Sequence, residues 1–101
     1  MKIIDKKEFE ETIKEGVTLV DFFATWCGPC KMLGPVLEEL SEEITDVKFV
    51  KIDVDEEPEL AGKFGIMSIP SVFLFKDGEV AGSFLGLQPK DKVKAFIEGN
   101  K

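Results

Sequence analysis

The sequence predicts an α/β fold: a central mixed five-stranded sheet flanked by four helices, with helices on both faces. Apolar runs rich in β-formers alternate with segments of helical periodicity, which is typical of strand-helix-strand units with parallel strands. The run at residues 17–24 is nearly all apolar, so it suits a central strand covered on both sides. Residues 71–76 and 79–85 flank Asp77-Gly78, a strong signal for a two-residue hairpin between antiparallel neighbours.

The N-terminal segment supplies a strand and a helix ahead of this central run. Residues 3–4 are expected to form a very short first strand. Asp5 followed by Glu8 resembles a capping box, which marks the start of a helix. Gly16 marks the point where that helix stops.

The longest predicted helix begins at the two cysteines of the chain. Its apolar positions follow helical spacing, with glutamates on the opposite side; they are Leu33, Val36, Leu37, Leu40 and Ile44. Gly34-Pro35 falls inside this helix, where proline removes a hydrogen bond and clashes with the preceding turn. We expect a kink there rather than a complete break.

Three further elements complete the sheet and its cover. Residues 47–54 are expected to form the next strand, and Pro58 starts a short helix that ends at Gly65. After the hairpin, Pro89 opens a final helix that ends near Gly99. The inward face of that helix carries Val93, Phe96 and Ile97.

Composition narrows the class of protein. With 44% apolar and 33% charged residues and no linker or repeat, residues 1–101 are expected to form a single domain. The chain has 13 basic and 20 acidic side chains, a net charge of −7 and no basic patch, so nucleic acid is not an expected partner. No apolar run is long enough to span a membrane, and residues 1–7 lack the apolar core of an export signal. We therefore expect a cytoplasmic protein that does not associate with membranes.

An acidic run between Asp53 and Glu59 resembles the start of a calcium loop. Counted from Asp53, the sixth position is Pro58, where such a loop needs glycine. The twelfth position is Phe64, where the loop needs glutamate. We interpret the run as a solvated surface.

The only two cysteines lie in the segment Trp26-Cys27-Gly28-Pro29-Cys30, in a chain without histidine. A Cys-x-x-Cys pair at a strand-to-helix junction is either a redox couple or half of a metal site. Structural zinc needs four ligands, so a metal would require a second chain, and we expect none. Two unrelated buried thiols are the remaining alternative, which the Gly-Pro pair disfavours. A disulfide closing so short a loop stabilises the fold little, which favours a chemical role.

In the redox interpretation the two sulfurs have different roles. Cys27 lies at the helix start, where the helix dipole and unpaired N–H groups favour a thiolate, so it is the expected nucleophile. Cys30 lies one turn later, on the same side and deeper, and is expected to resolve the mixed disulfide. Gly28 permits the tight entry and Pro29 fixes the first turn. Trp26 is expected to form an amphipathic lip, with burial in the core as the alternative.

Residues 21–32, which contain both cysteines, resemble the active-site segment of the thioredoxin family. The resemblance continues through residues 51–55, through Ile69-Pro70 before the hairpin, and through Gly86 after it. It covers the whole chain and implies the thioredoxin fold.

The resemblance also implies roles for two charged residues. Asp21 matches the buried carboxylate that accepts a proton from the second cysteine, and Lys51 matches the lysine that accompanies it. A lone aspartate in an apolar strand independently indicates a working or paired group, with a solvated strand end as the alternative. A solvated strand end is also the alternative for Lys51. Phe23 departs from the family, because many bacterial members have a second tryptophan there.

Residues near the hairpin are implied to bind substrate. Ile69-Pro70 matches the family's cis-proline turn, where the backbone of the residue before proline pairs with the substrate chain. Sequence alone leaves the isomer of this bond open. Gly86 is implied to keep the groove open, with a purely backbone requirement as the alternative. The implied substrate-binding set is Trp26, Gly28, Pro29, Ile69, Pro70 and Gly86.

The activity implied by the resemblance is general protein disulfide reduction. The chain would bind no cofactor. Its redox-active group would be a Cys27–Cys30 disulfide that receives electrons from NADPH through a flavoprotein, thioredoxin reductase. Disulfide-containing client proteins are the implied partners of an expected monomer. A disulfide oxidase or isomerase is an alternative that Gly-Pro disfavours, and a binding subunit that does not use its thiols is another.

Overall fold

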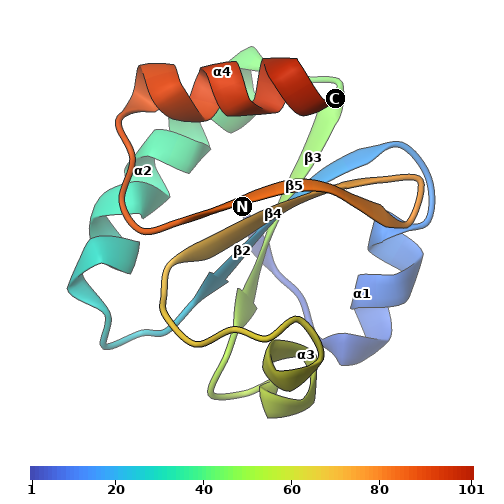
Figure 1. The fold of residues 1–101 in the computed structure, drawn as a ribbon, viewed down its shortest axis with the longest axis vertical. Helices are drawn as coiled ribbons and strands as arrows, with labels where there is room; N and C mark the ends of the chain where they lie inside the picture. The colour runs from blue at the N-terminus through green and yellow to red at the C-terminus, as the bar shows by residue number, and fades with distance from the viewer.

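Five strands and four helices make up the chain in the computed structural model, which describes residues 1–101. In chain order they are β1 (Lys2–Ile3), α1 (Lys6–Ile13), β2 (Val17–Phe23), α2 (Gly28–Glu43), β3 (Val47–Asp53), α3 (Pro58–Lys63), β4 (Ser71–Lys76), β5 (Glu79–Leu85) and α4 (Lys90–Asn100). The strands form one sheet in the order β1-β3-β2-β4-β5 (Figure 1). The predicted mixed five-stranded sheet with four helices is confirmed.

The pairing of the strands places β2 at the centre of the sheet. β3 runs parallel to β2, with Asp21 opposite Lys51, and β1 runs parallel to β3 at the edge. β4 pairs antiparallel with β2, and β5 pairs antiparallel with β4. The predicted parallel pair and hairpin are therefore confirmed. β2 ends at Phe23, one residue earlier than predicted.

The two faces of the sheet are covered by different helices (Figure 1). The face under α2 and α4 is aliphatic, and its cluster includes Leu19, Leu33, Leu37, Leu40, Val93 and Ile97. The face under α1 and α3 is rich in aromatic rings, namely Phe9, Phe22, Phe64, Phe73 and Phe75. Side chains alternate along a strand, so Asp21 and Phe23 share the α2 face with Leu19.

Local signals fix the ends of several elements. The Asp5 carboxylate accepts a hydrogen bond from the Glu8 N–H at 2.8 Å and caps α1, as predicted. Asp77 and Gly78 have φ angles of 49° and 88°, the positive values that a two-residue hairpin turn requires. The Asp77 carboxylate also accepts the Gly16 N–H at 2.8 Å, which fastens the hairpin to the segment after α1.

The long helix α2 runs from Gly28 to Glu43 through Pro35, so no complete break occurs there. Leu33 and Leu37, on either side of the proline, are both fully buried and belong to the same cluster. Across the sheet face, α4 begins directly after Pro89. No helix of the chain combines the length and the apolarity that crossing a bilayer requires.

Candidate active site

Cys27 and Cys30 lie where the central strand gives way to the long helix. Cys27 is the N-cap residue of α2, with extended backbone angles, and Cys30 lies in the first helical turn. Gly28 and Pro29 are the first two helical residues, positions where the missing N–H of proline leaves no bond unmade. The two cysteines form a disulfide with a Cα–Cα distance of 5.2 Å.

The Cys27 sulfur occupies the positive end of α2. The Cys30 N–H donates to Cys27 Sγ at 3.2 Å, as an N–H donates to the oxygen of an ordinary cap. The helix dipole adds to this bond, and both favour negative charge on that sulfur once the disulfide is reduced. Opposite it, the carbonyl oxygen of Ile69 lies 3.8 Å from Cys27 Sγ.

Burial does not separate the two cysteines. Cys27 is 4% exposed and Cys30 is 3% exposed, so the greater depth expected of Cys30 amounts to a very small difference in this disulfide form. The S–S bond draws both sulfurs into one cluster with Phe23 and Ala24. What distinguishes the cysteines is their place on α2, because only Cys27 caps the helix.

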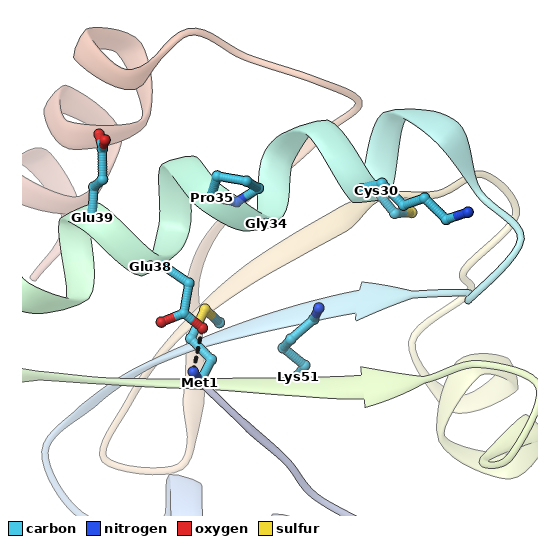
Figure 2. Close-up of a pocket in the computed structure, with 8 residues that line it drawn as sticks. Met1, Cys30, Gly34, Pro35, Glu38, Glu39 and Lys51 are labelled. Atoms are coloured by element: carbon cyan, nitrogen blue, oxygen red, sulfur yellow. Dashed lines mark hydrogen bonds and ion pairs between the residues drawn. The ribbon is translucent and has the colours of Figure 1, made fainter.

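A pocket of about 570 Å³ opens beside Cys30. It is lined by residues of α2, by Lys51 from β3 and by the N-terminal residue, and includes Lys31, Gly34, Pro35, Glu38 and Glu39. Figure 2 shows the Lys51 side chain extending from β3 toward α2. Cys30 is therefore part of the wall of an open pocket.

Asp21 is fully buried, and neither of its carboxylate oxygens has a hydrogen-bond partner. Burial raises the pKa of Asp21 from 3.8 to about 6, although the positive charge of Lys51 lowers it in part. Lys51 is directly opposite Asp21 in the sheet, and its Nζ lies 4.2 Å from the centre of the Phe23 ring. The structure thus brings these two sequence-predicted residues together on adjacent strands of the sheet.

Trp26 is largely exposed, so it is a lip of the site and not a core residue. Its indole Nε1–H donates to Asp55 Oδ2 at 2.8 Å. Sequence analysis had placed Asp55 in a solvated acidic surface and missed this contact. The two residues are 29 positions apart, and no local pattern connects them.

The segment before β4 forms the other wall of the site. The Ile69–Pro70 bond is cis, which settles the isomer that the sequence left open. The Gly86 N–H donates to the Pro70 carbonyl at 2.8 Å, so the end of β5 meets this wall. Gly86 has a φ of 79°, and a Cβ there would meet no atom within 4 Å. Within the chain, glycine is required at this position by the backbone angle.

The side chains gathered at the site include sulfur and carboxyl groups. No group of three or more His, Cys, Asp or Glu side chains is placed to hold a metal ion. The arrangement combines a sulfur on a helix tip, a second sulfur in the next turn and a buried carboxyl with a raised pKa. These groups are suited to exchange disulfides and to accept the proton that the exchange releases.

A family model, curated relatives and a solved structure that match this chain are all described as thioredoxin. A family model described as Thioredoxin matches residues 1–99. The thioredoxin of Listeria monocytogenes is 50% identical over 98 residues, covering 96% of this chain and 95% of that protein. The thioredoxin of Bacillus subtilis is 52% identical over 92 residues, covering 90% of this chain and 88% of that protein. The solved structure of Plasmodium falciparum thioredoxin superposes with a TM-score of 0.93 at 38% identity and covers 100% of both chains.

Proposed function

The chain belongs to the thioredoxin family, and we propose that it reduces client disulfides with Cys27 as the nucleophile and Cys30 as the resolving thiol. Its activity is that of a thiol–disulfide oxidoreductase, namely protein disulfide reduction through the Cys-x-x-Cys pair. The observation that supports these roles is the position of Cys27 Sγ at the α2 N-cap, where it accepts the Cys30 N–H.

The reaction moves two electrons from the dithiol to the client. The Cys27 thiolate attacks one sulfur of the client disulfide, whose S–S bond breaks and releases the first client thiolate. The Cys30 thiolate then attacks Cys27 Sγ in the mixed disulfide and displaces the second client thiolate. The product is the Cys27–Cys30 disulfide that the structure contains.

Asp21 is the proposed acceptor for the proton that Cys30 loses. It lies on the α2 face of the sheet, and its carboxylate has no hydrogen-bond partner. A carboxyl with a pKa of about 6 is a better base than an ordinary aspartate at neutral pH. Lys51, placed opposite, is the proposed positioning residue that keeps Asp21 ionised near neutrality.

Clients are proposed to bind across the wall formed by the Ile69-Pro70 segment. The Ile69 carbonyl lies beside Cys27 Sγ, where it is available to an extended client segment. Recognition by main-chain groups tolerates many client sequences. Trp26, Gly28, Pro29 and Gly86 complete the proposed surface.

The proposed cycle closes when electrons from NADPH reach the disulfide through a flavoprotein, thioredoxin reductase. The chain acts in it as a cytoplasmic monomer with no bound cofactor. Membership of the thioredoxin family supports a reductase and disulfide-containing clients as its partners.

Insulin reduction tests the proposed function. With dithiothreitol as the electron source, catalytic reduction of insulin is followed as the turbidity of the released B chain. Wild-type protein is expected to shorten the lag, whereas protein alkylated at its cysteines is not. An unchanged lag with the wild type would favour the alternative of a binding subunit that does not use its thiols.

A redox titration separates a reductase from an oxidase or isomerase. We expect the Cys27–Cys30 disulfide to stay oxidised until reduced glutathione is in large excess over oxidised glutathione. Reduction in a mixture that still contains mostly oxidised glutathione would favour the oxidase instead.

A further inference from the structure

The three methionines of the chain differ sharply in exposure. The Met1 side chain is 1% exposed, whereas Met32 is 63% exposed and Met67 is 97% exposed. Met67 is the most exposed of the large apolar residues of the chain. Burial of a side chain of this size would stabilise the fold, and the exposed Met67 makes no such contribution.

Met67 lies in the segment between α3 and β4, which forms one wall of the dithiol site. Ile69 in the same segment places its carbonyl oxygen 3.8 Å from Cys27 Sγ. Two residues span at most about 7 Å of chain, so Met67 stands at the rim of this wall. Its flexible thioether is therefore within reach of a client segment that binds along Ile69.

We propose that Met67 is a modification site, where hydrogen peroxide converts the thioether to a sulfoxide and so weakens the binding of protein clients. This inference rests on the proposed function, because it assumes that clients bind at the Ile69-Pro70 wall. A methionine suits such a rim when reduced, because its soft, unbranched side chain adapts to many apolar partners. The sulfoxide is polar and loses that contact.

The modification is a two-electron oxidation. The Met67 sulfur attacks one peroxide oxygen, the O–O bond breaks, and an S–O bond forms. The second oxygen leaves as water with the two peroxide hydrogens. In the disulfide form, neither Cys27 nor Cys30 has a thiolate that would consume the peroxide first, so the exposed thioethers react.

The test uses the full chain in its disulfide form. The protein is treated with hydrogen peroxide, quenched with catalase and mapped by peptide mass spectrometry. Oxidation is expected to be fastest at Met67, slower at Met32 and slowest at buried Met1. After reduction with dithiothreitol, kcat/KM for insulin is expected to fall about threefold, the effect of losing one apolar contact. The rate with the small disulfide 5,5′-dithiobis(2-nitrobenzoate), which has no polypeptide segment to bind along Ile69, is expected to match that of untreated protein.

Matched variants locate the effect. Met67→Leu keeps an apolar side chain without a sulfur, so after peroxide it is expected to retain the insulin rate of its own untreated sample. Met32→Leu is expected to show the same loss as the wild type. Equal oxidation of Met67 and Met1, an unchanged insulin rate in oxidised wild type, or an equal loss in Met67→Leu would overturn the inference. Untreated wild type that reduces neither substrate would instead contradict the proposed function itself.

Discussion

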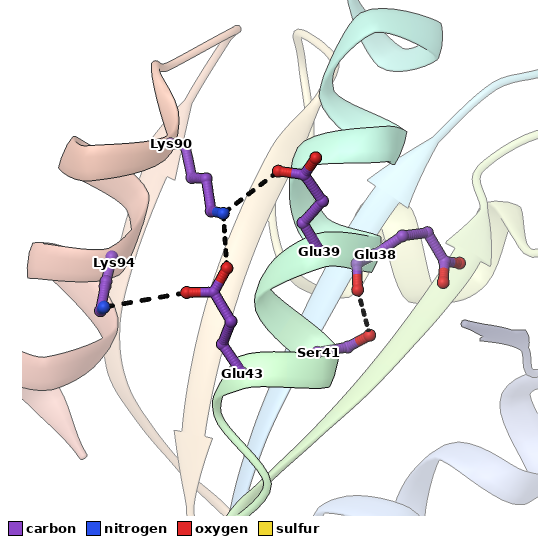
Figure 3. Close-up of polar contacts among 6 residues, drawn as sticks. All are labelled: Glu38, Glu39, Ser41, Glu43, Lys90 and Lys94. Atoms are coloured by element: carbon purple, nitrogen blue, oxygen red, sulfur yellow. Dashed lines mark hydrogen bonds and ion pairs between the residues drawn. The ribbon is translucent and has the colours of Figure 1, made fainter.

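The two ends of α2 show how one helix serves stability at one end and chemistry at the other. At the C-terminal end, Leu37 and Leu40 are fully buried against aliphatic residues of α4 and the sheet. On the surface above them, Lys90 pairs with Glu39 and Glu43, as Figure 3 shows. Apolar groups there are covered and charged groups are paired.

The N-terminal end of α2 breaks both of these rules. Trp26 and Met32 expose apolar surface next to the dithiol, and Asp21 leaves a carboxylate buried without a hydrogen bond. Such features lower the stability of a fold and persist where they have a use. This difference between the two ends of α2 predicts that substitutions at the C-terminal end mainly change stability. Substitutions around the N-terminal end should mainly change turnover.

The largest expected effect comes from the cysteines. Cys27→Ser is expected to reduce insulin turnover to the background rate, because no sulfur remains on the helix tip. Cys30→Ser is expected to trap clients as mixed disulfides through Cys27, since the second step cannot follow. Mass spectrometry of the trapped complexes checks this prediction. Trapping through Cys30 in the Cys27→Ser variant would reverse the assigned roles.

Leu37→Ala tests the stabilising end. The side chain is fully buried in the aliphatic cluster, so its truncation is expected to lower the free energy of unfolding by about 2–5 kcal/mol. Urea unfolding measures the change. Val80→Ala, at an exposed apolar position on β5, is the matched control and should change stability by no more than about 0.5 kcal/mol. Turnover at 25 °C should persist in the folded Leu37→Ala protein; a loss like that of Cys27→Ser would break the comparison.

In contrast to Leu37→Ala, Asp21→Asn is expected to slow turnover and to stabilise the fold at neutral pH. The pKa of Asp21 is raised from 3.8 to about 6 in the folded protein, so the folded state binds the proton more tightly than the unfolded state. Its contribution to stability is therefore greatest below pH 4, falls as the pH rises from about 4 to about 6, and stays low above that range. The difference between the two pKa values corresponds to about 3 kcal/mol.

The gain at pH 7 is expected to be about 2 kcal/mol, because the buried amide of asparagine also lacks partners. Urea unfolding of wild type and Asp21→Asn at pH 3 and pH 7 measures this gain. The quantity compared at each pH is the difference between the free energies of unfolding of the two proteins. Equal pH profiles and equal rates would show that Asp21 is solvated.

The smallest effect is expected from the surface ion pairs of the stabilising end. Glu43→Gln removes the charge that pairs with Lys90 and Lys94, whose side chains are both exposed. The melting temperature should therefore change less than in Leu37→Ala or Asp21→Asn. The difference from wild type should vanish in 1 M NaCl, where such charges are screened (Debye length about 3 Å). A larger change that persists in salt would mean that packing, and not charge, is lost.

Most of the fold could be predicted from the sequence because its signals are local. The Asp5 cap and the Asp77-Gly78 turn each depend on residues within one turn of chain, and both were predicted correctly. The family resemblance associates Lys51 with Asp21, whereas the register that sets the two residues opposite each other comes from the structure. The cysteine pair is evident from the sequence because the only two cysteines lie three positions apart.

Long-range contacts account for what the sequence could not predict. The hydrogen bond from Trp26 to Asp55 joins two loops through the fold, and nothing in the acidic run distinguishes Asp55 from its neighbours. The insertion of β4 beside β2 depends on which sheet edge is free. The nearly equal burial of Cys27 and Cys30 reflects the disulfide itself, a state that the sequence does not specify.

Alkylation of the reduced protein tests the central claim most directly. One equivalent of iodoacetamide at pH 7, followed by peptide mapping, reports which sulfur is the reactive thiolate. The position of Cys27 at the tip of α2 predicts that the label is found mainly on Cys27. Labelling of Cys30 first, or of both sulfurs equally, would contradict the claim that α2 activates Cys27.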